Sequence, residues 1–132
     1  MREFHLKIAT PDGVVFDAPA ESLLVKTADG DVEILAGHTD LIATVAIGRA
    51  RILAGSTARV ASVAGGFISV TKDDVSLVCT TFEFADNIDV NRAQAAKEEA
   101  EELIRQAKSD AQMRAAEAKL SRALNRIRVS KL

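Results

Sequence analysis

Three arginines in the last third of the chain have the spacing of an anion-binding site. Arg122 and Arg126 are four residues apart, so on a helix they lie one turn apart on the same face. If the chain turns back near Ser109, positions equidistant from that residue lie opposite each other, and Arg92 then faces Arg126. Asp89 lies one turn before Arg92. The spacing therefore gathers three guanidiniums and one carboxylate at the open end of a hairpin.

Such a cluster fits a small ligand that carries phosphate. Guanidinium groups repel one another unless an anion joins them, and the forked guanidinium is a preferred partner of phosphate oxygens. A helix that starts at Asp89–Ala93 adds free backbone N–H groups and the positive end of a helix dipole. The alternative is a solvated face, on which the arginines pair with exposed glutamates or lie over alanines. Spacing alone leaves both interpretations open.

The elements that must position these side chains are two helices within residues 87–132. This segment has no Gly or Pro, and its apolar residues recur at steps of three and four, as on one helix face. Ser109 followed by Gln112 has the pattern of a capping box, which starts a second helix, and Asn87 or Asp89 can cap the first. Most periodic residues of the first helix are alanine, and each contributes about 2 kcal/mol less burial free energy than leucine. The hairpin is therefore expected to be weakly held and able to open.

Residues 1–86 read as short strands. Apolar and polar residues alternate in runs such as "FHLKIA", and turn sequences such as "TPDG" and "ADGD" recur about every 8–12 residues. No long amphipathic helix interrupts them, which argues against a parallel sheet with alternating helices. The sequence predicts a domain of residues 1–86, an antiparallel β-sandwich of about ten strands, followed by a helical hairpin of residues 87–132.

Charge is distributed unevenly between these two parts. The formal net charge of the 132 residues is −2, which does not indicate nucleic acid as a partner. Residues 1–86 hold 7 Lys/Arg and 12 Asp/Glu, whereas residues 87–132 hold 10 and 7. From Met113 onward six basic residues stand against one acidic residue, so the terminal helix is expected to seek an acidic partner or an anionic surface.

The chain is expected to be soluble and cytoplasmic, and to be held at a membrane only by partners. Its single cysteine, Cys79, permits no internal disulfide and lies in an apolar run typical of a buried strand. The N-terminus "MREFHLKIAT" is too polar for a signal peptide. No apolar run approaches the ~20 residues that a membrane span needs.

No other residues have the pattern of a catalytic or metal-binding site. His38 has only His5 as a fellow histidine, and no Cys/His cluster accompanies them, so His38 is interpreted as a loop residue. The sequence "AGG" at 64–66 is not followed by the Lys-Ser/Thr of a phosphate-binding loop. Ser22 and Ser62 have no nearby His and Asp arrangement. We therefore expect no catalytic residue and no metal.

Five segments, in order, resemble the epsilon subunit of bacterial F-type ATP synthase over nearly the whole chain. They are "TPDGVVFDA" near the start, "GDVEILAGHTDLI" at 30–42, "VAGGFISV" at 63–70, "IDVNRA" at 88–93 and "RALNR" at 122–126. The fourth fits the Ile/Leu-Asp-x-x-Arg-Ala motif of nucleotide-binding members of that family.

The resemblance implies a non-catalytic subunit of the central stalk, which couples the c-ring to gamma during proton-driven ATP synthesis. In that family the β-sandwich binds the gamma subunit and the polar loops of the c-ring. By resemblance, Asp31 and His38 stand where a c-ring contact is expected, on a loop from Gly30 to Leu41. The tail either lies folded or extends along gamma, where its basic helix approaches an acidic region of the beta subunits and blocks ATP hydrolysis. Such a subunit is a peripheral protein on the cytoplasmic face of the bacterial membrane.

In some members of the family ATP binds the folded hairpin and favours that state. The ATP-binding residues implied for this chain are Glu83, Ile88, Asp89, Arg92, Ala93, Arg122 and Arg126. Glu83 is assigned to the base or ribose.

The chain departs from the family pattern in two places. Glu99 and Ala115 stand where nucleotide-binding relatives carry basic residues, so phosphate binding is expected to be weaker. Ala36 and Asp40 replace two prolines of the Gly30–Leu41 loop, which is expected to be more mobile. The alternative to a stalk subunit is a stand-alone ATP sensor that reports to another partner.

Overall fold

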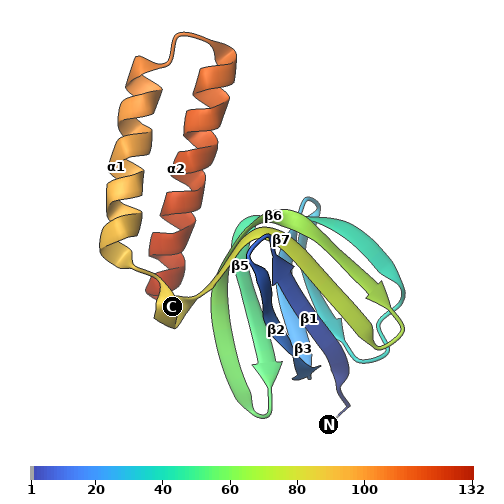
Figure 1. Cartoon of the computed structure of the whole chain (residues 1–132). Coiled ribbons are helices and arrows are strands. Elements are labelled where there is room, and N and C mark those ends of the chain that lie inside the picture. Colours follow the sequence, from blue (N-terminus) through green and yellow to red (C-terminus); the bar gives the residue numbers. More distant parts are fainter. Residues whose placement is uncertain (1) are drawn as a thin grey trace. The chain divides into compact units, whose positions relative to one another are not determined.

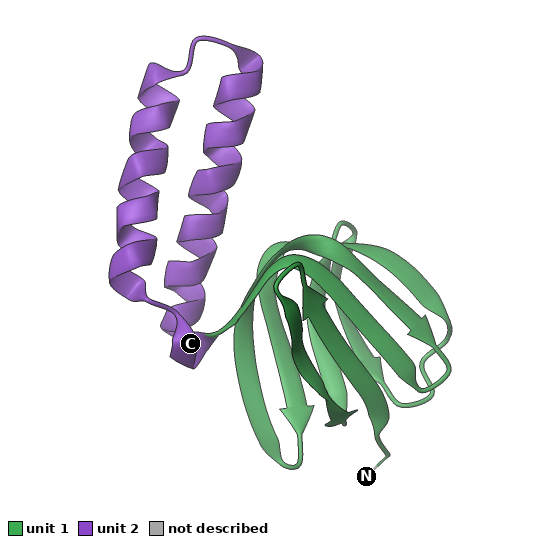
Figure 2. Cartoon of the chain, viewed as in Figure 1, with its two compact units in different colours: residues 1–84 green, residues 85–132 purple. Residues whose placement is uncertain are grey.

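The computed structural model describes residues 2–132, which form two compact units (Figure 1, Figure 2). The first unit ends at Phe84, and the second is Ala85–Leu132. The first consists of strands, and the second consists of a short 3-10 helix and two α-helices.

Seven strands make up the first unit. They are β1 (Phe4–Thr10), β2 (Gly13–Ala20), β3 (Ser22–Thr27), β4 (Gly30–Leu35), β5 (Leu41–Ala54), β6 (Thr57–Thr71) and β7 (Asp74–Phe84). Their order in the sheet is β2-β1-β7-β6-β5-β3-β4. The pairs are antiparallel except β1 with β7, which run parallel. The predicted class, a β-sandwich domain followed by a helical hairpin, is confirmed, and all but one of the strand pairs are antiparallel as predicted.

The sheet folds over its own core because its long strands bend. The first half of β5 pairs mainly with the second half of β6 and meets β3 at Thr27 and Val45, whereas the second half of β5 pairs with β3 and with the first half of β6. The pairing between β5 and β6 is interrupted between Val45 and Gly48 of β5 and between Val63 and Gly66 of β6. Large aliphatic side chains from the whole sheet fill the space so enclosed, among them Leu6, Ile8, Leu23, Ile34, Ile52, Ile68 and Leu77.

The number of strands is seven and not about ten. The sequence predicts strand ends at Gly48 and at 65–66, but both positions lie inside continuous strands. Glycine permits a strand to bend without ending it, so a glycine between two apolar runs does not distinguish two short strands from one bent strand. The parallel pairing of β1 with β7 also departs from an entirely antiparallel sheet.

The second unit consists of η1 (Ala85–Asn87), α1 (Val90–Gln106) and α2 (Asp110–Ser130). A short link joins the two α-helices, which run antiparallel (Figure 1). Oγ of Ser109 accepts the backbone N–H of Gln112 at 3.1 Å, and the Gln112 side chain accepts the N–H of Lys108 at 2.9 Å. The predicted cap at Ser109 is therefore confirmed, with Lys108 as the reciprocal donor.

Small side chains line the contact between the helices. The buried apolar residues of α1 and α2 are Ala93, Ala100, Ala116, Ala123 and Val129. Two larger apolar residues of α1, Val90 and Leu103, stay 45% and 40% exposed. Alanine buries little apolar surface, so this contact contributes far less burial free energy than the aliphatic core of the first unit.

We therefore expect the backbone amides of α1 and α2 to exchange with solvent faster than those of β5, β6 and β7. Local opening of the helical pair exposes little apolar area, and the difference should be at least about tenfold, which corresponds to 1.4 kcal/mol. Hydrogen exchange followed by mass spectrometry measures it. Equal protection of helices and central strands would contradict a weakly held pair.

Gly66 lies where β6 and β7 approach too closely for a side chain. Its φ is 147°. A Cβ on this residue would overlap the carbonyl oxygen of Val78 and lie 2.7 Å from Cα of Cys79. Glycine is therefore required at this position by the packing of two backbones as well as by its φ.

Replacing Gly66→Ala should lower the free energy of unfolding by about 3 kcal/mol, because backbone atoms must move to admit the methyl group. Gly55→Ala is the matched control: Gly55 also has positive φ, at 57°, but nothing lies within 4 Å of an added Cβ. The control should cost about 1 kcal/mol. Urea unfolding of both variants tests the difference, and equal losses would show that only φ matters.

Candidate functional site

An ion pair between the helices indicates their register. Nζ of Lys119 on α2 lies 2.7 Å from Oε1 of Glu99 on α1. Both residues are ten positions from Ser109. This pair agrees with the predicted register, in which residues equidistant from Ser109 lie opposite each other.

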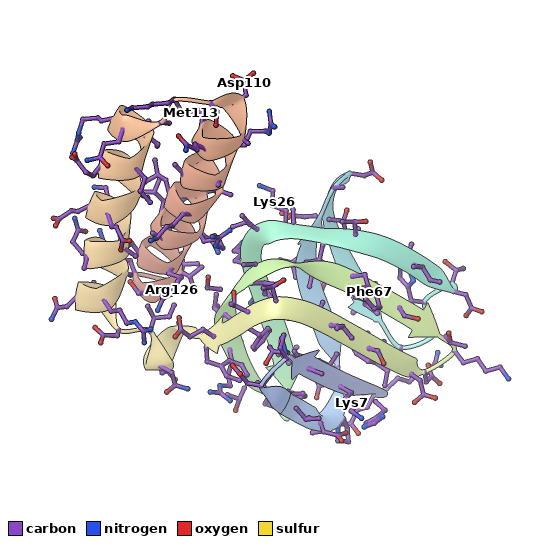
Figure 3. The ribbon with its side chains drawn as sticks, turned by 45° about the horizontal axis from the view of Figure 1, so that its top comes forward. Lys7, Lys26, Phe67, Asp110, Met113 and Arg126 are labelled. Carbon is purple, nitrogen blue, oxygen red and sulfur yellow. The ribbon has the colours of Figure 1, made fainter. Side chains whose placement is uncertain are left out.

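The same register aligns the predicted arginines. Arg92 and Arg126 each lie seven residues, about two helical turns, from the ion pair, and therefore on the same side of the hairpin as Glu99 and Lys119. Arg122 lies about one turn from both Lys119 and Arg126. We call Lys119, Arg122 and Arg126 the cationic row of α2. Arg92 of α1 faces its end at the open side of the hairpin, where Figure 3 shows Arg126.

Residues of this region differ in their access to solvent. Arg92 and Arg122 are exposed, and Arg126 is half-buried. Ala93 is fully buried and Ile88 is 8% exposed. The two alkyl residues of the predicted motif thus pack within the protein, whereas its arginine, Arg92, is exposed.

The start of α1 offers fewer backbone donors than predicted. Oδ1 of Asp89 accepts the N–H of Arg92 at 3.0 Å, and the Asp89 carbonyl oxygen accepts the N–H of Ala93 at 2.9 Å. Asp89 is the N-cap of α1, so these two N–H groups are already satisfied. The expectation of free backbone N–H groups at the start of α1 therefore does not hold for Arg92 and Ala93.

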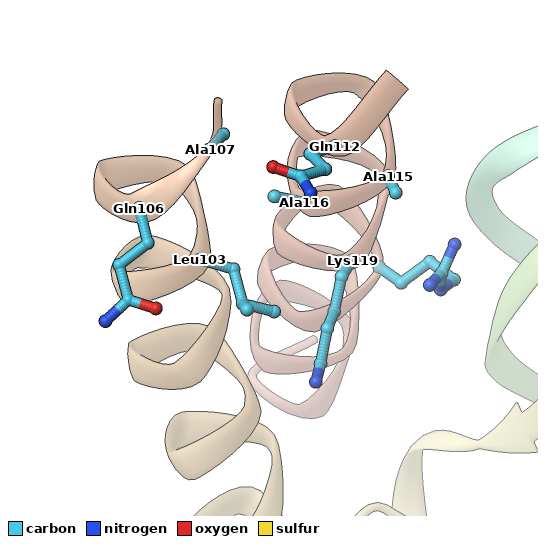
Figure 4. Close-up of a pocket in the computed structure, with 8 residues that line it drawn as sticks. Leu103, Gln106, Ala107, Gln112, Ala115, Ala116 and Lys119 are labelled. Carbon is cyan, nitrogen blue, oxygen red and sulfur yellow. The ribbon is translucent and has the colours of Figure 1, made fainter. Parts of the chain in front are cut away.

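Farther toward the closed end of the hairpin, the two helices flank a groove of about 450 Å³ (Figure 4). Its lining residues are Leu103, Gln106 and Ala107 of α1 and Gln112, Ala115, Ala116, Lys119 and Arg122 of α2. Apolar side chains and two amides line most of the groove, and both of its cations belong to the cationic row. The row and the groove therefore form one continuous surface.

Two glutamates of α1 pair with different cations, one on the same helix and one on α2. Nε of Arg105 donates to Oε2 of Glu102 at 3.0 Å. The hydrogen bond and charge of Arg105 hold the pKa of Glu102 below its ordinary value. Glu99 instead reaches across to Lys119, so it is the carboxylate that meets the cationic row. Sequence analysis missed Lys119, although its distance from Ser109 equals that of Glu99.

The other predicted site residues lie in the first unit. Glu83 is a half-buried residue of β7 that pairs with Ser62 of β6. Asp31 lies at the start of β4, and His38 lies in the loop after β4 ends. They therefore stand at opposite ends of a six-residue strand, roughly 20 Å long. The expectation that Gly30–Leu41 is a single loop is wrong, because its first half is strand.

The loop that carries His38 is tied to the β6–β7 turn. Oδ1 of Asp40 accepts the N–H of Lys72 at 3.1 Å, and Oδ1 of Asp73 accepts the N–H of Gly37 at 3.0 Å. Asp40 therefore supplies a tether that a proline could not. Such reciprocal bonds argue against the mobility expected from the loss of proline. His38 is a loop residue, as predicted, and its Nδ1 lies 2.7 Å from the carbonyl oxygen of Thr39.

Cys79 is buried in β7, as predicted, and its burial raises the pKa of the thiol to about 11. A thiol with so high a pKa is a poor nucleophile at neutral pH. Over residues 2–132, the structure places no group of three or more His, Cys, Asp or Glu side chains where they could hold a metal ion. No helix in the same range has both the length and the apolar character that crossing a membrane requires.

Two family models match the chain, one for each part. Residues 3–85 match the model described as ATP synthase, Delta/Epsilon chain, beta-sandwich domain. Residues 86–131 match the long alpha-helix domain of the same chain. Together they account for almost all of the sequence.

Curated relatives named ATP synthase epsilon chain are similar over their full length. The protein of Bacillus velezensis is 38% identical over 130 residues, which is 98% of each chain. That of Halalkalibacterium halodurans is 38% identical over 131 residues, again 98% of each. That of Caldanaerobacter subterraneus is 38% identical and covers 98% of this chain and 94% of its own.

Two solved structures share the fold. A chain in the Euglena gracilis mitochondrial ATP synthase, OSCP/F1/c-ring, superposes with a TM-score of 0.77 at 22% identity and covers 90% of this chain and 76% of its own. A chain in the central stalk/c-ring of the Tetrahymena thermophila mitochondrial ATP synthase gives a TM-score of 0.72 at 12% identity, with 98% and 97% covered.

Proposed function

The chain belongs to the delta/epsilon chain family of ATP synthase, and we propose that it is the epsilon subunit in the central stalk of a bacterial F-type ATP synthase. In this role it couples the c-ring to gamma during proton-driven ATP synthesis and performs no catalysis itself. It is held by its partners at the cytoplasmic face of the membrane. The observation that supports this assignment most directly is the ordered match of both family domains to one chain.

An exposed apolar row on the sheet suits the contact with gamma. Thr44, Phe67, Val78, Ala9 and Val14 are register partners across five adjacent strands. Phe67, Val78 and Val14 are 49%, 39% and 54% exposed, and the Phe67 side chain is drawn in Figure 3. Contiguous exposed apolar side chains mark protein contacts. Because the c-ring presents polar loops, we assign this apolar row to gamma.

The proposed contact with the c-ring includes one of the two residues that the sequence predicts. Asp31 is exposed beside the turn between β3 and β4. A polar side chain at the tip of this hairpin suits contact with a polar loop of the c-ring. His38 is half-buried at the opposite end of β4, and its ring is engaged with the Thr39 backbone. We therefore keep Asp31 in this contact and leave His38 out.

Copurification from cells tests the stalk assignment. A tagged chain should recover gamma and c-ring components, and Phe67→Asp should reduce the recovery of gamma at least about tenfold, because a buried unpaired charge opposes the contact. Leu35→Asp is the control, since Leu35 is 53% exposed outside the apolar row. Binding of ATP without recovery of either partner would instead favour a stand-alone sensor.

The helical pair is proposed to be the regulatory part. ATP, with its base toward the start of α1 and its phosphates among Arg92, Arg122 and Arg126, favours the folded hairpin. Without ATP the pair separates, and its basic helix extends toward the acidic region of a beta subunit and inhibits ATP hydrolysis. The shift cannot exceed the preference of ATP for the folded state. The alanine contact supports this proposal because little burial free energy is lost when the two helices separate.

Calorimetric titration of ATP should show binding to the wild type and a loss of at least about tenfold in Arg126→Ala, since one charge-assisted contact to phosphate is removed. Arg128→Ala is the matched control, because Arg128 is an exposed arginine of α2 outside the cationic row. Equal affinity of the Arg126 and Arg128 variants would place the ligand elsewhere.

A further inference from the structure

The acidic side chain of Glu99 on α1 contacts Lys119 of the cationic row. The register pairs residues of the two helices in five steps from the open to the closed end: Arg92 with Arg126, Ala96 with Arg122, Glu99 with Lys119, Leu103 with Ala115, and Gln106 with Gln112. The first steps are cationic, and the last two are apolar or amide. The Glu99–Lys119 pair therefore stands at the boundary between the two halves.

The two partners of this pair differ in their exposure to solvent. The Lys119 side chain is 33% exposed and lines the groove, whereas that of Glu99 is 64% exposed. An exposed ion pair is worth little, so exchanging one anionic partner for another costs little. The Glu99 carboxylate can turn into solvent, and the Lys119 ammonium can remain in the groove. An incoming phosphate therefore competes with one carboxylate for one ammonium.

We propose that the Glu99–Lys119 pair reads the terminal phosphate of the bound nucleotide, an inference that rests on the ATP site proposed above. With the base toward the start of α1, the phosphates run along the cationic row toward the closed end. Arg126 and Lys119 are seven residues apart, about 10 Å along the helix. The third phosphate of ATP reaches Lys119 and displaces Glu99, whereas the shorter chain of ADP ends near Arg122. Lys119 thus favours ATP over ADP, and Glu99 opposes it.

The direction of each effect separates this role from a structural one. Glu99→Gln and Lys119→Gln remove the same ion pair, so each deprives the hairpin of the same contact. If the pair only holds the helices together, both variants weaken ATP binding. If it reads the terminal phosphate, Glu99→Gln strengthens binding because the competing carboxylate is gone, and Lys119→Gln weakens it because the cation is gone.

Calorimetric titration of ATP and ADP into the full chain makes the test. Glu99→Gln should raise the affinity for ATP about threefold to tenfold, and Lys119→Gln should lower it by a similar factor. The affinity for ADP should change less than about twofold in both. Glu98→Gln is the matched control: it makes the same change of charge at an exposed neighbour and should leave both affinities unchanged.

Each of the following results would overturn the inference. Weaker ATP binding in both variants would make the pair structural, and equal shifts for ATP and ADP would remove its link to the third phosphate. An Arg126→Ala variant that binds ATP as tightly as the wild type, or a wild type that binds none, would overturn the ATP site and this inference together. Loss of binding in Arg126→Ala with unchanged affinities in both Glu99 and Lys119 variants would overturn this inference alone.

Discussion

The register between α1 and α2 is the constraint on which the proposed site depends. Alanines at the contact let the helix backbones approach closely, and the ion pair of Glu99 with Lys119 marks their alignment. Successive residues of a helix are rotated by about 100°. A slip of one residue would therefore turn Arg126 away from Arg92 and divide the cationic row from its counterpart. Charges that repel when aligned are thus held in place by contacts that are individually weak.

That weakness is consistent with a regulatory role, because a ligand can shift an equilibrium only by its own preference for one state. A helical pair with a leucine-rich contact would stay closed whatever ATP did. The first unit, in contrast, is held together by a large aliphatic core. Large aliphatic side chains such as Leu6, Ile52 and Leu77 are fully buried in it, so it can serve as a rigid base for partner contacts.

Sequence predicts best where one local rule decides the structure. The period of the apolar residues predicted the two helices, and the capping pattern at Ser109 predicted the turn and therefore the register. The strand count failed because Gly48 and Gly66 bend strands without ending them, which depends on tertiary pairing. Asp31 and His38 were assigned to one loop by resemblance to a family, although the alternation in "DVEIL" is that of a strand. Lys119 was missed because the register was applied only to arginines.

Asp89 explains why the proposed site needs so many cations. Its carboxylate caps α1 and occupies the position where a helix start would otherwise attract a phosphate. Helix stability and anion binding therefore compete at this residue, and the arginines must outweigh it. Counting Lys119 with Arg92, Arg122 and Arg126, four cations stand against the carboxylates of Asp89 and Glu99. Both acids therefore lower the affinity for phosphate, but in different ways: Glu99 can turn away into solvent when a ligand arrives, whereas Asp89 caps α1 and cannot leave without weakening the helix.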